Sequence, residues 1–206
     1  MDHRIETWAR KFHIYISLYL LLFMLLFFIS GLILNHSNWE FTQFWSKRKV
    51  STLDRVIQPP EVTGDIAKAK DIMRQLDISG EVALAANRPA DGKFIFGVVR
   101  PGKNLRIETD INSGRATVTQ IDVNTWGIMY ALHLFTGVRG NQERDWFMTR
   151  IWSASIDAVG VGLILLVISS CYLWYKRKRK RLQGAIILGL GIFLCGFFLF
   201  GLSWIS

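Results

Sequence analysis

Three long runs of apolar residues stand out against an otherwise mixed sequence. Residues 14–34, 158–175 and 184–206 contain no Asp, Glu, Lys or Arg and are 21, 18 and 23 residues long. A helix needs about 20 apolar residues to cross the hydrocarbon core of a bilayer, and it satisfies its own backbone hydrogen bonds there. The pattern predicts three transmembrane helices, the second of which extends back to Ile151 if Asp157 is tolerated.

The region between the first two runs has the pattern of a small α+β domain. Helical spacing of apolar residues predicts a helix over 66–76, with Ile66, Ala69, Met73 and Leu76 on one face. The preceding Thr63-Gly64-Asp65 can cap this helix. Strand-like segments follow at 81–87, 93–100, 105–110 and 115–122, with turns at 89–92 and 112–114. We expect an antiparallel sheet covered on one face by the helix.

These patterns divide the chain into six segments. The expected order is a cytoplasmic N-terminus with the first span at 1–36, a small domain at 37–125, an amphipathic helix and loop at 126–150, the second span at 151–175, a basic loop at 176–183 and the third span at 184–206.

The distribution of charge predicts the orientation of these spans. The chain has 25 Lys and Arg against 16 Asp and Glu, a net charge of +9, which by itself raises nucleic acid as a partner. Six basic residues, however, form one block at 176–181 between two spans. Short loops rich in Lys and Arg remain in the cytoplasm, so we expect the N-terminus and this block inside and the domain outside, in a bacterial periplasm. The block then suits anionic lipid headgroups, and nucleic acid is not expected as a partner.

Three segments together resemble a known family. Residues 107–115 (Ile-Glu-Thr-Asp-Ile-Asn-Ser-Gly-Arg) resemble the last hairpin of the PepSY domain, which often carries an Asp-x-x-Ser/Thr-Gly turn. Lys11-Phe12-His13 before the first span, which ends in Ser-Gly-Leu-Ile-Leu-Asn-His at 30–36, is similar to the first helix of PepSY-associated transmembrane proteins. Leu-His-Leu-Phe-Thr-Gly at 132–137 and the span ending at Arg177 are similar to their second helix. The resemblance implies three transmembrane helices with an inserted PepSY-like α+β domain in the periplasm, anchored in the bacterial inner membrane.

Histidines near the ends of the spans are the candidate chemistry. His36 and His133 are both expected on the outer side, and His13 lies 23 residues before His36, roughly 35 Å away along a helix. Trp126, Tyr130 and His133 are spaced to share one helix face. Two neutral imidazoles are the natural axial ligands of a b-type haem. Ordinary interfacial histidines explain His36 and His133 equally well from the residues alone, and explain His13 better.

The resemblance favours the haem hypothesis for His36 and His133. Some members of the family that the chain resembles are similar to redox proteins that bind b-type haem and reduce ferric siderophores at the periplasmic face. This implies electron transfer to a periplasmic acceptor such as a ferric chelate, as a reductase or an electron-transfer subunit. Electron transfer across the membrane would need a second redox centre near the inner face, where the chain supplies only His13. A second copy or another membrane subunit would supply the other ligand of that centre. The alternative is a non-catalytic anchor, assembly or regulatory subunit of a larger membrane complex.

Asp157 is the only charged residue within a predicted span. A charge inside a membrane is costly, so it is a functional candidate by default. An ion pair with Arg150, Arg139 or Arg144 is the favoured interpretation of Asp157, and a role toward a haem propionate or a proton is the second.

Overall fold

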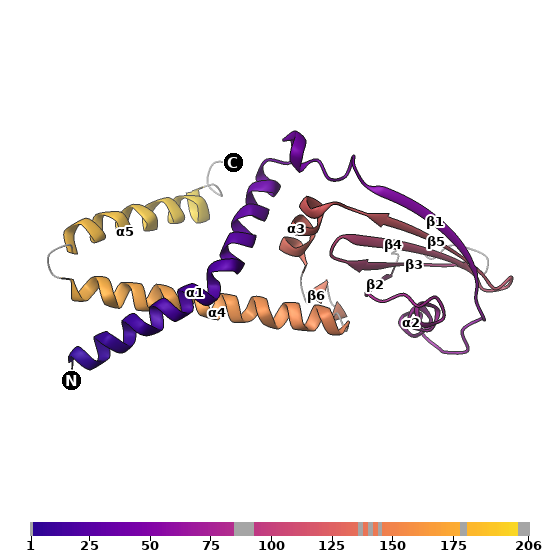
Figure 1. Ribbon diagram of the computed structural model, residues 1–206, viewed down its shortest axis with the longest axis horizontal. Coiled ribbons are helices and arrows are strands. Elements are labelled where there is room, and N and C mark those ends of the chain that lie inside the picture. The colour runs from indigo at the N-terminus through magenta and orange to yellow at the C-terminus, as the bar shows by residue number, and fades with distance from the viewer. Residues whose placement is uncertain are drawn as a thin grey trace. The chain divides into compact units, whose positions relative to one another are not determined.

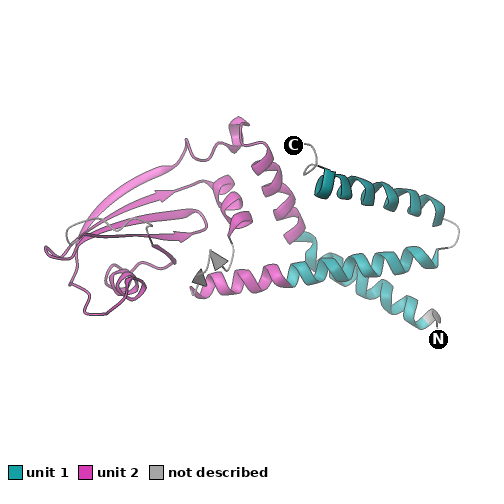
Figure 2. Ribbon diagram, turned by 180° about the vertical axis from the view of Figure 1, so that it is seen from behind, with its two compact units in different colours: residues 1–22, 158–206 teal, residues 23–157 magenta. Residues whose placement is uncertain are grey.

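The computed structural model describes residues 2–84, 93–135, 138–139, 142–143, 146–177 and 181–201. Two compact units divide the chain, one made of residues 1–22 and 158–206 and the other of residues 23–157 (Figure 2). The turn expected at 89–92 and residues 178–180 of the basic block lie outside the described residues.

Within the described part of the chain, three helices are long and apolar enough to cross a membrane, which agrees with the predicted number. They are α1 (Asp2–Asn35), α4 (Phe147–Lys176) and α5 (Arg181–Gly196), and α5 continues into the π-helical turn η3 (Phe197–Gly201). Both α1 and α4 begin well before their apolar runs, so each carries a polar first section ahead of its apolar stretch.

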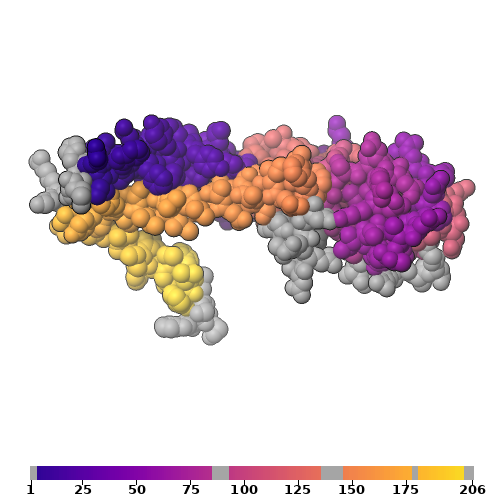
Figure 3. Space-filling view, turned by 90° about the horizontal axis from the view of Figure 1, so that it is seen from below, coloured from indigo at the N-terminus to yellow at the C-terminus, as the bar shows by residue number. Residues whose placement is uncertain are grey.

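The first unit is held together by close packing at small residues. Leu20 of α1 is fully buried, and a Cβ added to Gly162 of α4 would lie 3.1 Å from its Cδ2. The start of α5 packs on α4, because a Cβ at Gly184 would overlap the indole of Trp174. Beyond this connection α5 departs from α4 (Figure 3), and none of the residues of α5 is buried.

A five-stranded antiparallel sheet forms most of the second unit, in the order β1-β5-β4-β3-β2 (Figure 1). Its strands are β1 (Lys49–Val56), β2 (Glu81–Leu84), β3 (Lys93–Arg100), β4 (Lys103–Asp110) and β5 (Arg115–Asp122). The last four match predicted strands. The edge strand β1 was not predicted, and it pairs along its whole length with β5, from Lys49 opposite Asp122 to Val56 opposite Arg115. The short strands β6 (Val138–Arg139) and β7 (Gln142–Glu143) pair separately.

Helix α2 (Asp65–Gln75) covers one face of this sheet, as expected (Figure 1). The core between them consists of alternate apolar residues from the strands together with one face of the helix: Ile57, Ala69, Ile72, Met73, Phe96, Val98, Leu105, Ile107, Ala116 and Val118. Ile72 faces the core instead of the predicted Ile66, which is 43% exposed. The helix begins after Gly64, at φ 96°, and no side chain caps it, in contrast to the expected cap.

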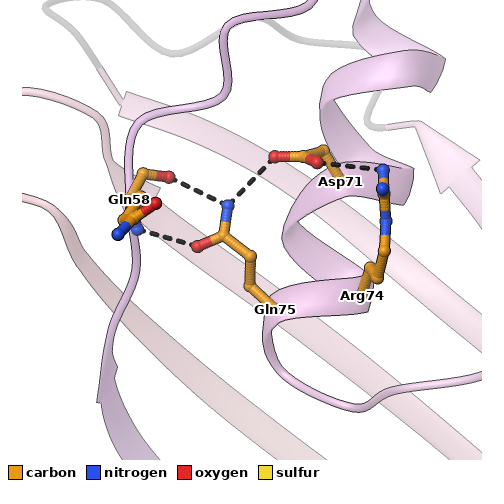
Figure 4. A network of polar contacts seen from close by, with 4 residues as sticks. All are labelled: Gln58, Asp71, Arg74 and Gln75. Carbon is orange, nitrogen blue, oxygen red and sulfur yellow. Dashed lines mark hydrogen bonds and ion pairs between the residues drawn. The ribbon is translucent and has the colours of Figure 1, made fainter.

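A polar network fixes the connection between β1 and α2 (Figure 4). The backbone N–H of Gln58 donates to Oε1 of Gln75 at 2.7 Å, and Nε2 of Gln75 donates to the carbonyl of Gln58 at 3.1 Å. The same Nε2 donates to Asp71 at 3.0 Å, and Asp71 also pairs with Arg74. The connecting segment is therefore tied to the last turns of α2.

The Asp-x-x-Ser-Gly segment forms the turn between β4 and β5. Oδ1 of Asp110 accepts hydrogen bonds from the N–H groups of Asn112 at 3.0 Å and Ser113 at 3.3 Å. Gly114 adopts φ 65°, which glycine tolerates best. Its carbonyl accepts the N–H of Ile57 at 2.8 Å. The turn thus also holds the chain that leaves β1.

Candidate functional site

His133 is positioned by a serine in the first apolar helix. It lies near the end of α3 (Thr125–Leu134), a helix capped by the side chain of Asn124. Its Nδ1 is 2.7 Å from the hydroxyl of Ser30 in α1, and Ser30 is fully buried. That hydroxyl also donates to the carbonyl of Phe27 at 3.1 Å.

The contact between His133 and Ser30 bears on the tautomer of the His133 ring. A serine hydroxyl has one hydrogen to donate, and in the observed geometry it can go to the carbonyl of Phe27. In that case Nδ1 of His133 donates its hydrogen to Ser30, and the neutral ring keeps its lone pair on Nε2. Among the residues that the structure describes, no other hydrogen bond engages this ring.

The surroundings of His133 are apolar and close-packed. The ring of Phe27 meets the imidazole edge-on at a centroid distance of 5.3 Å. Gly31 leaves room beside the ring, since a Cβ there would lie 3.8 Å from Cε1 of His133. The indole N–H of Trp152 in α4 donates to the carbonyl of Phe135 at 3.0 Å and fixes the end of α3. A histidine donating through Nδ1 with a free Nε2 is the arrangement that metal-ligating histidines adopt.

His36 has a different environment. Its ring stacks on Trp39 at a centroid distance of 4.2 Å and an interplanar angle of 2°. Its backbone N–H donates to Leu32, so it still follows the repeat of α1. His36 is nine residues after Phe27, about two and a half helical turns, which places it on the opposite side of α1 from the face that contacts His133. The structure therefore does not bring the two histidines together within one chain.

Aromatic rings link the end of α1 to α3. Trp39 contacts Phe41, and Phe41 contacts Trp126 edge-on at a centroid distance of 5.4 Å. Phe44 contacts Tyr130 at 5.0 Å. Trp126, Tyr130 and His133 thus all contact the segment 27–44, as the predicted shared face requires. The short helix η1 (Glu40–Thr42) shapes this segment.

His13 repeats the arrangement of His133 within the first unit. Its Nδ1 is 2.9 Å from the hydroxyl of Ser169 in α4. That hydroxyl donates to the carbonyl of Leu166 at 2.9 Å, so the same tautomer, with Nδ1 donating to Ser169, is compatible with the contact. Both serines lie inside apolar runs, and no role was predicted for either of them from the sequence. The available signal in the sequence was a polar serine within each apolar run, because such a hydroxyl can hydrogen-bond a histidine of a neighbouring helix.

Asp157 is exposed. No ion pair joins it to Arg150 in the described part of the chain. The side chains of Arg139 and Arg144 lie outside the described residues, so those pairings stay predictions. Among the described residues, no group of three or more His, Cys, Asp or Glu side chains could hold a metal ion. A haem held by two axial histidines does not require such a group.

Comparison with known proteins gives one match. The family model described as "Putative PepSY_TM-like" matches residues 7–205. No curated protein and no solved structure matches the chain. The match extends over all three apolar helices and the sheet between them.

Proposed function

The chain belongs to the PepSY_TM-like family, and from this premise we propose that it is an inner-membrane electron-transfer protein that binds b-type haem through His133. The acceptor would be a chelated ferric ion or a similar species on the side of the membrane that holds the sheet domain. The basic block at 176–181 supports a cytoplasmic N-terminus and a periplasmic domain.

The bond between His133 and Ser30 carries this proposal. Haem iron takes an imidazole nitrogen as an axial ligand and cycles between two oxidation states. His133 fits that role, because Ser30 holds Nδ1 at 2.7 Å and leaves the lone pair of Nε2 for a ligand. The packed ring of Phe27 restrains the imidazole and helps to exclude water.

His36 does not fit as the second ligand of the same iron within one chain. It lies on the opposite side of α1 and stacks on Trp39. A second axial ligand would therefore come from a second copy or another membrane subunit, or His36 would serve a separate site. His13, with its own serine partner Ser169, is the matching candidate in the first unit.

A visible spectrum tests the proposal. The full chain, purified in detergent from haem-replete cells, should show the α band of b-type haem after reduction with dithionite. The band should be lost in His133→Ala and kept in His3→Ala, the control. A colourless wild-type protein, or a spectrum unchanged in His133→Ala, would reject His133 as a ligand. Retention of the band in His36→Ala is expected if the ligands are not paired within one chain.

The exposed surface of α5 favours a second candidate function. None of its residues is buried, and large apolar side chains such as Ile187 and Phe193 are about 70% exposed. A membrane helix with this little contact to its own chain suits an assembly subunit that packs against another protein. Native mass spectrometry of the detergent-solubilised protein from its own membranes would support this role if a stoichiometric partner is retained. A chain that is always recovered alone and binds haem would contradict it.

A further inference from the structure

A cavity of about 510 Å³ opens between α3 and the turn that joins β3 to β4. Its apolar wall includes Val99, Val123, Leu134 and Phe135, and the aromatic rings of Phe44 and Tyr130 also line it. Cavities of this size accommodate small organic ligands. The wall belongs entirely to the second unit and contains none of the candidate haem ligands.

Two cations lie on the turn that borders the cavity. Arg100 and Lys103 both line it, at the end of β3 and the start of β4. Lys103 pairs with Asp122 at 3.4 Å, and Arg100 donates to the hydroxyl of Ser79 at 3.3 Å. Gln120 also donates to Asp122, at 2.6 Å. Asp122 pairs with Lys103 and also feels the charge of Arg100. Among the described residues of this border, two cations therefore face one carboxylate, which suits the border to an anion.

The walls of the cavity are fixed by two glycines. Gly102 adopts φ 86° in the turn, and a Cβ there would lie 2.6 Å from Cγ1 of Ile128 in α3. Gly127 of α3 approaches Val123 and Phe44 just as closely. At both glycines the backbone packs directly against a side chain, which leaves little freedom for the turn and α3 to move relative to each other. The cavity is therefore preformed.

The cavity also lies next to the end of the first apolar helix. Phe44, Trp45 and Tyr130 line both this cavity and a neighbouring hollow of about 370 Å³. That hollow reaches Ile33 in the last turn of α1 and Ser37 just beyond it. An apolar helix end marks the level of the lipid headgroups, and aromatic rings favour the same level. Lipid is therefore the ligand class that meets this opening at high local concentration.

We propose that the cavity binds a phospholipid with an anionic headgroup. An acyl chain would occupy the apolar wall between Val123 and Phe135, and the phosphate would contact Arg100 and Lys103. This site is independent of the proposed haem function. A soluble phosphate compound would satisfy the two cations but leave the apolar wall in contact with water, so the acyl chain is an essential part of the ligand.

Native mass spectrometry with lipids of defined headgroup tests this site. The full chain is reconstituted in nanodiscs of phosphatidylcholine and phosphatidylglycerol in equal amounts and then released into detergent. Wild-type protein should retain phosphatidylglycerol in preference to phosphatidylcholine. Arg100→Ala with Lys103→Ala should reduce that retention at least tenfold. Lys68→Ala with Arg74→Ala, on α2 and outside the cavity, should leave it unchanged.

Two further variants separate loss of the site from loss of the fold. Arg100→Lys with Lys103→Arg keeps both charges and should retain the lipid. Ala131→Trp fills the cavity and should expel the lipid while the melting temperature stays close to that of wild type. Glycerol phosphate should not compete, because it lacks the acyl chain. Equal retention of both lipids, unchanged retention in the double alanine variant, or displacement by glycerol phosphate would each overturn the proposal.

Discussion

The carboxylate of Glu81 accepts a hydrogen bond from the hydroxyl of Thr149 at 2.9 Å, and this bond joins the edge strand β2 to the first turn of α4. Thr149 is fully buried and Glu81 is 6% exposed. The same carboxylate oxygen accepts the backbone N–H of Trp146 at 3.2 Å. A negative charge at a helix N-terminus is favourable, so Glu81 both caps α4 and fastens it to the sheet.

Thr149→Val should destabilise the chain by about 1–3 kcal/mol, because it leaves a buried carboxylate with one donor fewer. The measurement is the thermal midpoint of the full chain in detergent. Thr117→Val is the matched control, since the hydroxyl of Thr117 also bonds a carboxylate, that of Asp54, but at the surface. Its effect should stay within about 0.5 kcal/mol. Equal effects of the two substitutions would show that the bond to Glu81 has no special role.

Gly114→Ala should destabilise the sheet domain more than Gly64→Ala. Both glycines have positive φ, at 65° and 96°, where alanine is strained by about 1–3 kcal/mol. At Gly114 the new Cβ would also lie 2.8 Å from the carbonyl oxygen of Ile57, whereas at Gly64 nothing lies within 4 Å. Chemical unfolding of both variants compares the two costs. A smaller loss of stability for Gly114→Ala than for Gly64→Ala would contradict the prediction.

Asp110 should make the stability of the sheet domain depend on pH in the acid range. The Ser113 hydroxyl and the N–H groups of Ser113 and Asn112 hold the pKa of Asp110 below its ordinary value of 3.8, and Lys93 contributes. The unfolded chain therefore binds this proton more readily. The stabilisation is complete above the ordinary pKa and is lost as the pH falls through the lowered one.

Asp110→Asn should accordingly lower the thermal midpoint at pH 6 more than at pH 3. Ser113→Ala removes the largest cause of the lowered pKa and should reduce the same pH-dependent component. Midpoints of wild type and both variants are measured between these two pH values. Curves for wild type and Asp110→Asn that run parallel over the whole range would contradict the prediction.

Gly184→Ala should loosen the pairing of α4 with α5. A Cβ at Gly184 would overlap the indole of Trp174, so the helices must separate or the indole must move. Overpacking of this kind costs about 1–3 kcal/mol. Gly189→Ala is the control in the same helix, because nothing lies within 4 Å of its added Cβ, and alanine favours a helix. Thermal unfolding followed by tryptophan fluorescence should show a lower midpoint for Gly184→Ala only.

Ser30→Ala should weaken haem binding by about 10–100-fold, the usual effect of removing a partner that orients a ligating histidine. Ser30→Thr keeps the hydroxyl and should restore binding. Ser17→Ala is the control, since among the described residues the hydroxyl of Ser17 bonds to the backbone of His13 and to no histidine ring. Haem titration and the redox midpoint of the bound haem give two readouts. A Ser30→Ala protein with unchanged affinity and midpoint would show that Ser30 does not orient a ligand.

The sequence predicted the elements whose patterns are strong. Runs without charge predicted the three apolar helices, and alternating residues predicted β3 to β5. Strand β1 was not predicted, because all eight of its residues are exposed and no buried face imposes an alternation of apolar and polar residues. Only pairing with β5 at the sheet edge makes it a strand.

The residues of the candidate site stand out in the sequence, but their geometry does not. Charge and spacing pointed to His36 and His133 as candidates. Which side of α1 His133 contacts, however, depends on where α3 packs. Ser30 reads as a tolerated small residue within an apolar run, and its role depends on a neighbour 103 positions away in the chain. Tertiary packing, which local patterns do not encode, determines both relationships.

The course of α1 and α4 restricts how the sheet domain can be studied by itself. The second unit includes the last part of α1 and the first part of α4. A soluble fragment beginning after residue 36 and ending before residue 146 would lack Ser30 and Phe27, which hold His133, and Thr149, which bonds Glu81. Such a fragment could fold and still give a negative result in a haem assay. Haem-binding experiments on this family member therefore need its apolar helices, in detergent or in lipid.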